Sequence, residues 1–188
     1  MRLKDFYEGS LSFRQATESD VPSLTSIGNS WTEMAFTEGS AFSKDELAKS
    51  IENGNLPPIP DASLQNYGLY LILSENACKT QSKLESKGSP IGLLELYKGY
   101  PNPNTLWIGL FIIDSKYRHN GYGTQCLQSI INFAKSNDLT HIGIGVSLKN
   151  WRGLRFWHSI GFDKIERITG DVLYSEKTHA LLSLSRPI

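Results

Sequence analysis

The chain has 188 residues, 39% hydrophobic and 20% charged, a composition typical of one folded domain rather than a disordered segment. Its 19 basic and 19 acidic side chains cancel. This balance argues against nucleic acid or an anionic membrane as the main partner, because binding to either rests on excess positive charge. The N-terminus lacks the apolar core of a signal peptide, and no apolar run is long enough to span a bilayer. We therefore expect a single domain over residues 1–188 in the cytoplasm, with neither nucleic acid nor membrane as partner.

Cysteine and histidine usage indicates neither a disulfide framework nor a metal centre. Only Cys78 and Cys126 are present, no CxxC occurs, and the four histidines show no i, i+4 pairing. We expect no bound metal. Cys126 falls inside a predicted helix with no evident base partner, so a core thiol is the better interpretation than a covalent nucleophile.

The N-terminal elements are a strand and two helices. A strand is predicted from Leu11 (LSFRQAT), and the following ATESDVPSL indicates a helix start that Ser19 or Thr17 would cap. The apolar residues of the segment 27–42 show neither helical nor strand periodicity. A second helix (SKDELAKSIEN) is predicted with Ser43 as its cap, and a loop with consecutive prolines follows it.

The rest of the chain predicts a sheet. Strands over 67–75, 89–100 and 104–113 form an antiparallel meander, with a polar loop (NACKTQSKLESKG) between the first two. A helix (GYGTQCLQSIINFAKSN), a strand over 141–146, another helix (NWRGLRFWHSI) and two strands (FDKIERI and HALLSLS) complete the chain. The order β-α-α-β-β-β-α-β-α-β-β predicts a mixed α/β fold on one sheet.

The junction IIDSKYRHNGYGTQ is the most informative stretch. Gly121 and Gly123 let a ligand approach the backbone closely, and the first turn of the following helix offers unpaired N–H groups with a partial positive charge. Arg118 and His119 add charge from the side. The pattern R-x-x-G-x-G is therefore suited to phosphates. The alternative is a turn that holds two glycines without binding anything.

Other nucleotide motifs fit less well. No G-x-x-x-x-G-K-[ST] string occurs, and Gly143 and Gly145 lie inside a strand pattern without the third glycine of a dinucleotide fingerprint. Close packing against a neighbour is the simpler interpretation of that pair. A nucleotide-binding protein that uses the phosphate motif for another ligand stays open.

R-x-x-G-x-G after a strand, Asn150 opening a later helix, and FWHSIGF together resemble the GCN5-related N-acetyltransferase (GNAT) superfamily, from Leu11 to about residue 168. The resemblance implies a mostly antiparallel sheet flanked by helices, whose fourth and fifth strands (104–113 and 141–146) splay apart around acetyl-CoA. The strand before the motif usually carries a bulge whose backbone pairs with the cofactor, which the resemblance places at Phe111, Ile112 and Ile113. The implied cofactor-binding residues are Phe111, Ile112, Ile113, Arg118, His119, Asn120, Gly121, Tyr122, Gly123, Thr124, Asn150, Phe156 and Trp157.

The resemblance also implies the reaction: an acetyl group moves from acetyl-CoA to a primary amine of a small molecule or peptide, by direct attack in a ternary complex. A homodimer is common in that superfamily. The sequence departs from the pattern at Trp157, where a tyrosine is frequent. An indole N–H is only a donor and is no practical acid at neutral pH. A non-catalytic acyl-CoA-binding sensor is therefore the alternative function.

A base is needed as well, because deprotonating an alkyl amine at pH 7 costs roughly 4.6 kcal/mol. Carboxylates commonly take such protons. The candidates are Glu95, within IGLLELY, and Asp114, at the end of a strand. Burial would raise the pKa of Glu95 and suit it to the task. On an alternating strand, however, the simpler interpretation is that Glu95 points into solvent, and Asp114 would equally serve as a turn or cap residue.

Overall fold

The structure of the protein, a computed structural model, describes residues 3–77 and 88–188. Its strands form one eight-stranded sheet in the order β1-β2-β3-β4-β5-β6-β8-β7, and every neighbouring pair is antiparallel except β5 and β6. The strands are β1 (Phe6–Glu8), β2 (Leu11–Gln15), β3 (Tyr67–Ser74), β4 (Ser89–Lys98), β5 (Thr105–Ile113), β6 (His141–Ser147), β7 (Lys164–Gly170) and β8 (Ala180–Pro187). The predicted mixed α/β fold with a mostly antiparallel sheet is confirmed.

Helices cover both faces of this sheet. They are α1 (Val21–Asn29), α2 (Met34–Glu38), α3 (Lys44–Asn53), α4 (Tyr122–Ser136) and α5 (Trp151–Ser159). Side chains of α1 and α3 pack on one face, and those of α4 and α5 pack on the other. Within residues 3–77 and 88–188, no helix is long and apolar enough to cross a membrane.

The caps of the N-terminal helices follow the sequence signals. The Ser43 hydroxyl accepts a hydrogen bond from the Glu46 N–H at 3.3 Å and begins α3. Thr17, rather than Ser19, is the N-cap of the 3-10 turn η1 (Glu18–Asp20) that leads into α1, whose own N-cap is Asp20. The Thr17 N–H and hydroxyl both donate to Asp20 Oδ2 at 2.8 Å. The guanidinium of Arg14 completes the arrangement with two hydrogen bonds to the Asp20 carboxylate, at 2.7 and 2.9 Å.

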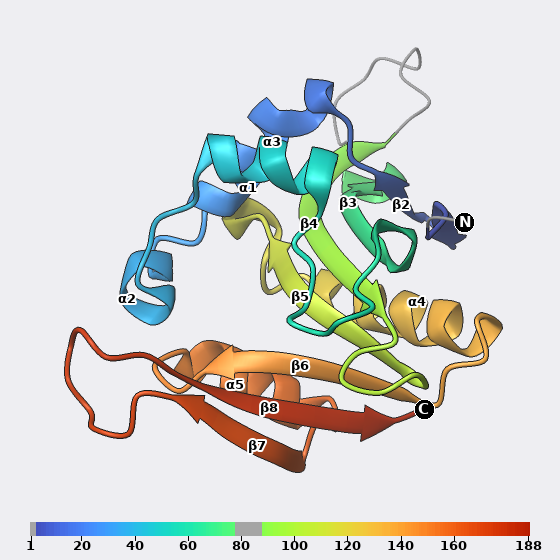
Figure 1. Cartoon of the computed structure of the whole chain (residues 1–188). Helices are drawn as coiled ribbons and strands as arrows, with labels where there is room; N and C mark the ends of the chain where they lie inside the picture. The colour runs from blue at the N-terminus through green and yellow to red at the C-terminus, as the bar shows by residue number, and fades with distance from the viewer. Residues whose placement is uncertain (1–2, 78–87) are drawn as a thin grey trace.

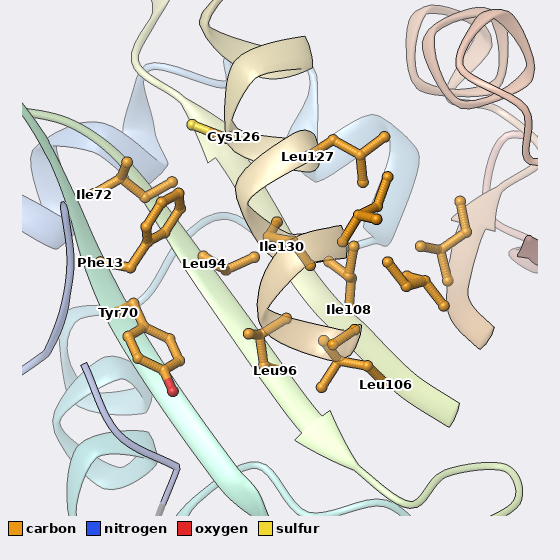
Figure 2. Close-up of a cluster of buried hydrophobic side chains, with 14 of the residues drawn as sticks. Phe13, Tyr70, Ile72, Leu94, Leu96, Leu106, Ile108, Cys126, Leu127 and Ile130 are labelled. Atoms are coloured by element: carbon orange, nitrogen blue, oxygen red, sulfur yellow. The ribbon is translucent and has the colours of Figure 1, made fainter. Parts of the chain in front are cut away.

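The core on the α4 face holds the sheet to its longest helix. Figure 2 shows Ile130 of α4 beside Leu94 of β4, with Leu127 farther along the helix, and all three belong to one buried cluster. Cys126 is fully buried in the same cluster, and burial raises the pKa of its thiol to about 12. The thiol therefore stays protonated, as expected of the predicted core cysteine.

Two short elements were not predicted: β1 and α2. Both are too short for their apolar residues to show a helical or strand periodicity. Tertiary contacts hold α2 in place. The Thr37 carbonyl of α2 accepts hydrogen bonds from the Ser147 hydroxyl at 2.6 Å and from the His179 ring at 3.2 Å. Residues 78–87 of the predicted polar loop, with Cys78, lie outside the described residues.

The predicted divergence of the strands over 104–113 and 141–146 is present as the separation of β5 from β6. Their last pair is Ile108 with Ile144, although both strands continue beyond it. Figure 1 shows the two strands meeting near the C-terminus and separating toward the left. Among the described residues, no strand covers one edge of residues 109–113, so backbone N–H groups on this edge are open to a ligand, whereas the Ile113 carbonyl accepts from Arg118 Nε.

The bulge in β5 lies before the position that was expected. Glu95 pairs with Leu110 and the next residue of β4 pairs with Ile108, which leaves Gly109 as the extra residue. Residues 111–113 pair with β4 in regular register. The expectation of a bulge at residues 111–113 was therefore wrong.

Candidate active site

A cleft of about 420 Å³, here called the α4 cleft, lies where β5 and β6 separate. Its lining combines the free end of β5, the start of α4 and the start of α5. All the predicted cofactor-binding residues except Asn120 and Tyr122 line it: Phe111, Ile112, Ile113, Arg118, His119, Gly121, Gly123, Thr124, Asn150, Phe156 and Trp157. The structure therefore brings together residues that are far apart in the sequence.

Each of the two glycines of the motif is favoured at its position for a different structural reason. Gly121 is the N-cap of α4 with φ of 80°, a left-handed conformation that is strained for residues with a side chain. A Cβ at Gly123 would lie 3.1 Å from Phe156 Cζ, so this glycine lets α5 approach α4 closely. Together they shape a helix start whose unpaired N–H groups are suited to an anion.

Arg118 brings a positive charge to that helix start. Its Nε donates to the Ile113 carbonyl at 2.8 Å, which fixes the side chain against the end of β5 and leaves the Nη groups for a ligand. Burial lowers the pKa of Arg118, yet a guanidinium stays charged near neutral pH. The amide of Asn120 donates to the carbonyls of Arg118 and Tyr117, at 2.9 and 3.3 Å, so it shapes the loop. Tyr122 packs against the Tyr117 ring.

The opposite wall of the α4 cleft is aromatic. The Trp157 ring lies 5.8 Å from Phe111 and 5.1 Å from Phe156, centroid to centroid. Trp157 is only 8% exposed and also packs against Phe162 in the core. Asn150 is the N-cap of α5, because its Oδ1 accepts from the Gly153 N–H at 2.8 Å, and it also lines the α4 cleft.

A second cleft of about 690 Å³, here called the α3 cleft, lies on the face of the sheet covered by α1 and α3. Its lining comes from α3 and the residues after it, from Met34 and Phe42, and from β3, β4 and β5. Glu95 of β4 lies in this lining and is only 6% exposed. The interpretation of Glu95 as a solvated residue is therefore wrong, because β4 is a central strand whose two faces are both covered.

The Glu95 carboxylate is held by two hydrogen bonds. The Tyr67 hydroxyl donates to Oε2 at 3.0 Å, and Asn55 Nδ2 donates to Oε1 at 3.1 Å. A Cβ at Gly109 would overlap Oε1, so the bulge glycine makes room for the carboxylate. Burial raises the pKa of Glu95 to about 7, although both hydrogen bonds favour the ionised form. The group can therefore exchange a proton near neutral pH.

Asp114 has a different position. It is 6% exposed, but it lines neither cleft. Its Oδ1 accepts from the Lys116 N–H at 3.2 Å and caps the 3-10 turn η4 (Ser115–Tyr117), while Oδ2 pairs with the Lys116 ammonium at 3.2 Å. The cap interpretation of Asp114 fits this geometry better than a role as a base.

The two clefts meet at β5. Leu110 lines the α3 cleft, whereas Phe111 and Ile112 line the α4 cleft, so neighbouring residues of one strand face two spaces. Glu95 pairs with Leu110 across the strands, and its carboxylate lies against Gly109, the first residue of β5 beyond the pairing with β6. A titratable carboxylate thus lies at the point where the sheet opens between the clefts.

The sequence profile of the acetyltransferase (GNAT) family matches residues 45–162. The chain belongs to the GNAT family. The matched segment contains Glu95, the diverging strands and the start of α4, so it includes most of the lining of both clefts. A search of curated proteins finds no match.

Solved structures of acetyltransferases share this GNAT fold. An acetyltransferase from Thermus thermophilus has a TM-score of 0.67 at 17% identity, covering 97% of this chain and 100% of that chain. A Salmonella typhimurium acetyltransferase that modifies the N-terminal serine of a ribosomal protein has a TM-score of 0.67 at 18% identity, covering 96% of each chain. A chimeric spermidine N-acetyltransferase from Vibrio cholerae has a TM-score of 0.66 at 14% identity, covering 94% of this chain and 95% of that chain.

Three residues around Glu95 in this GNAT protein were not predicted from the sequence: Asn55, Tyr67 and Gly109. Asn55 lies in the loop after α3, and its contact with Glu95 spans 40 positions of the chain. Gly109 gave only a weak signal, as an isolated glycine inside a strand pattern, which often marks a bulge. Tyr67 gave none, since aromatic residues are ordinary in strands.

Proposed function

We propose that the protein is an N-acetyltransferase that moves an acetyl group from acetyl-CoA to a primary amine of a small molecule or peptide, by direct attack in a ternary complex. The observation that supports this most is the buried Glu95 carboxylate, with its pKa of about 7, at the opening between the two clefts. The acceptors named for two structures of similar fold, a protein N-terminus and spermidine, are both amines.

In this proposal the α4 cleft binds acetyl-CoA, which supplies an activated acetyl thioester. The N–H groups of the first turn of α4 and the Arg118 guanidinium bind its phosphates, with His119 beside them. The free edge of β5 at residues 111–113 provides backbone N–H groups, and an N–H that donates to the thioester carbonyl would stabilise negative charge on its oxygen. The apolar walls, including Phe156 and Trp157, exclude water.

The acceptor amine enters through the α3 cleft in the same proposal. Glu95 takes the proton that the amine must lose, either directly or through one water, and a carboxyl group with a pKa near 7 is well matched to that transfer at neutral pH. Trp157 cannot protonate the departing thiolate. A thiol pKa of about 8.5 makes the thiolate an adequate leaving group that water can protonate.

Calorimetric titration of acetyl-CoA, free CoA, ATP and NAD into the protein tests the proposal first, and a thiol-release assay over a panel of amines tests it second. We expect micromolar binding of acetyl-CoA and CoA, weak binding of ATP and NAD, and turnover with at least one amine. Binding without turnover would favour the acyl-CoA sensor instead. Tight ATP or NAD binding without CoA binding would favour a nucleotide-binding protein.

Arg118→Ala should raise the Kd for free CoA by about tenfold or more, because a charge-assisted contact with phosphate is lost. Arg155→Ala is the matched control, since Arg155 is exposed on α5 and does not line the α4 cleft. Calorimetry on both variants measures the difference. An unchanged Kd in Arg118→Ala would remove the phosphate assignment.

Cys126→Ala should leave the rate of acetyl transfer within about twofold of the wild-type rate, because this buried thiol lies in the core rather than in either cleft. The substitution removes one buried atom and should cost about 1 kcal/mol of unfolding free energy. Chemical denaturation and the thiol-release assay measure the two effects. Loss of turnover in a variant of normal stability would point to a covalent route through Cys126.

A further inference from the structure

A third cleft of about 450 Å³, here called the C-terminal cleft, shares no lining residue with the α3 and α4 clefts. It lies over the half of the sheet formed by β5, β6, β8 and β7, and its lining comes entirely from strands and loops. The proposed acetyl transfer uses none of these residues. The space is of a size that holds a small ligand.

The floor of the C-terminal cleft contains a hydroxyl that is accessible to a ligand. Ser183 of β8 is 7% exposed, and its hydroxyl has no hydrogen-bond partner among residues 3–77 and 88–188. The neighbouring hydroxyls are satisfied, since Ser185 donates to Glu166 at 2.5 Å and Thr105 donates to Asn102 at 2.9 Å. Among the described residues, Ser183 Oγ is not an enclosed atom without a partner, so it is accessible from the cleft, and a ligand oxygen can replace the water that hydrates it.

Arg167 provides an uncompensated positive charge directly across from Ser183. The two residues pair in the β7–β8 register, and both line the cleft. Arg167 Nη2 donates to the Tyr100 hydroxyl at 2.6 Å, which holds the guanidinium in place, and Arg167 forms no ion pair with any carboxylate in the described part of the chain. Its remaining N–H groups are suited to a planar oxyanion.

The other charged groups around Arg167 add little to the net charge of the cleft lining. Lys164 and Glu166 pair with each other at 2.9 Å, so their charges cancel. His141 Nδ1 is within hydrogen-bond distance of the Thr140 hydroxyl, at 2.9 Å. The net charge of the cleft lining at neutral pH is therefore positive and comes from Arg167.

Trp107 adds an aromatic wall. A Cβ at Gly143 would lie 2.8 Å from Trp107 Cε3, so the indole lies close against the glycine-rich strand β6. This contact confirms the interpretation of Gly143 as close packing against a neighbour, whereas a Cβ at Gly145 would make only an ordinary contact with Trp107. The half-buried ring lines the C-terminal cleft and offers apolar surface to a ligand with a flat body.

We propose that the C-terminal cleft is a second ligand site, which binds a small carboxylate with a planar apolar body. The carboxylate contacts Arg167 and the Ser183 hydroxyl, and the body packs against Trp107. Arg167 defines the charge of the ligand, Ser183 fixes the position of one oxygen, and Trp107 selects a flat shape. The site is separate from the proposed binding of acetyl-CoA and amine.

Titration of the isotope-labelled protein with benzoate, benzamide and acetate, followed by amide and indole NMR shifts, tests the site. We expect benzoate to shift the signals of Gly143, Ser183 and the Trp107 indole. Benzamide should bind with an affinity about tenfold lower, because it lacks the negative charge. Acetate should also be weaker, because it lacks the flat body. Shifts centred on the α4 cleft, or benzamide binding as tightly as benzoate, would overturn the proposal.

Three variants localise the binding. Arg167→Gln and Ser183→Ala should each raise the Kd for benzoate about fivefold or more. Arg155→Ala removes the same charge outside the cleft and should leave this Kd unchanged. Ser183→Ala removes only one oxygen atom, so it keeps the test informative even if Arg167→Gln folds poorly. Binding of acetyl-CoA to each variant provides an independent check of the fold. Equal benzoate affinity in Ser183→Ala and the wild type would exclude the site.

Discussion

Glu95→Gln should lower kcat for amine acetylation by about 10²- to 10⁴-fold, the range expected when a general base is removed. The change keeps the size of the side chain and an oxygen for the Tyr67 hydroxyl, so the cleft should keep its shape. The Kd for acetyl-CoA should stay within about twofold of the wild-type value, because Glu95 does not line the α4 cleft. Steady-state kinetics and calorimetry separate the two effects.

The pH dependence gives the same substitution a second test. Wild-type kcat should rise as the pH passes through about 7, where Glu95 ionises, and the variant should lack this rise. The pKa of Glu95 in the folded protein, about 7, lies above the ordinary value of 4.5. Between pH 4.5 and about pH 7, the native state therefore binds more protons than the unfolded chain. Ionising Glu95 should therefore cost the wild type about 3 kcal/mol of unfolding free energy as the pH rises through that window. A variant that keeps both the rise and the rate would exclude Glu95 as the base.

Gly109→Ala should lower kcat by about 10²-fold with little change in acetyl-CoA affinity. The new Cβ would overlap Glu95 Oε1, so the carboxylate must move away from both the bulge and Asn55 Nδ2. A shift of about 1 Å in a catalytic group is enough for a loss of this size. The backbone of Gly109 is not in the left-handed region, so the strand itself accepts alanine.

Gly145→Ala is the matched control for Gly109→Ala. It adds the same methyl group to the neighbouring strand, where the new Cβ would lie 3.4 Å from Trp107 Cζ2, an ordinary contact. We expect near wild-type kcat in this control, measured in the same assay. Equal losses in both variants would indicate a general effect on the sheet instead of displacement of Glu95.

The sequence allowed the strand–helix junction that lines the α4 cleft to be predicted because that junction is local. Arg118, Gly121 and Gly123 lie within six consecutive positions at a strand–helix junction, and the physical reasons for a helix start operate over one turn. The divergence of the strands was implied by family resemblance. The cap of α3 at Ser43 was equally local and was also correct.

The environment of Glu95 could not be predicted in the same way. Its burial depends on α3 and the following loop lying over the sheet, and Asn55 reaches it from a loop far away in the sequence. Alternation along β4 gives the face on which Glu95 lies, but it does not show whether another element covers that face. The helix α2 escaped prediction for a related reason, because contacts from Ser147 and His179 hold its five residues.

The positions of the α3 and α4 clefts on either side of β5 have a consequence for inhibitor design. In the proposed reaction acetyl-CoA enters through the α4 cleft and the amine through the α3 cleft. Free CoA and the acetylated product can therefore leave independently, because neither occupies the route of the other. A bisubstrate inhibitor, with a CoA part joined to an amine part, would have to pass the edge of β5 near Gly109. Its linker should therefore be narrow at that point, and its selectivity would come from the amine half.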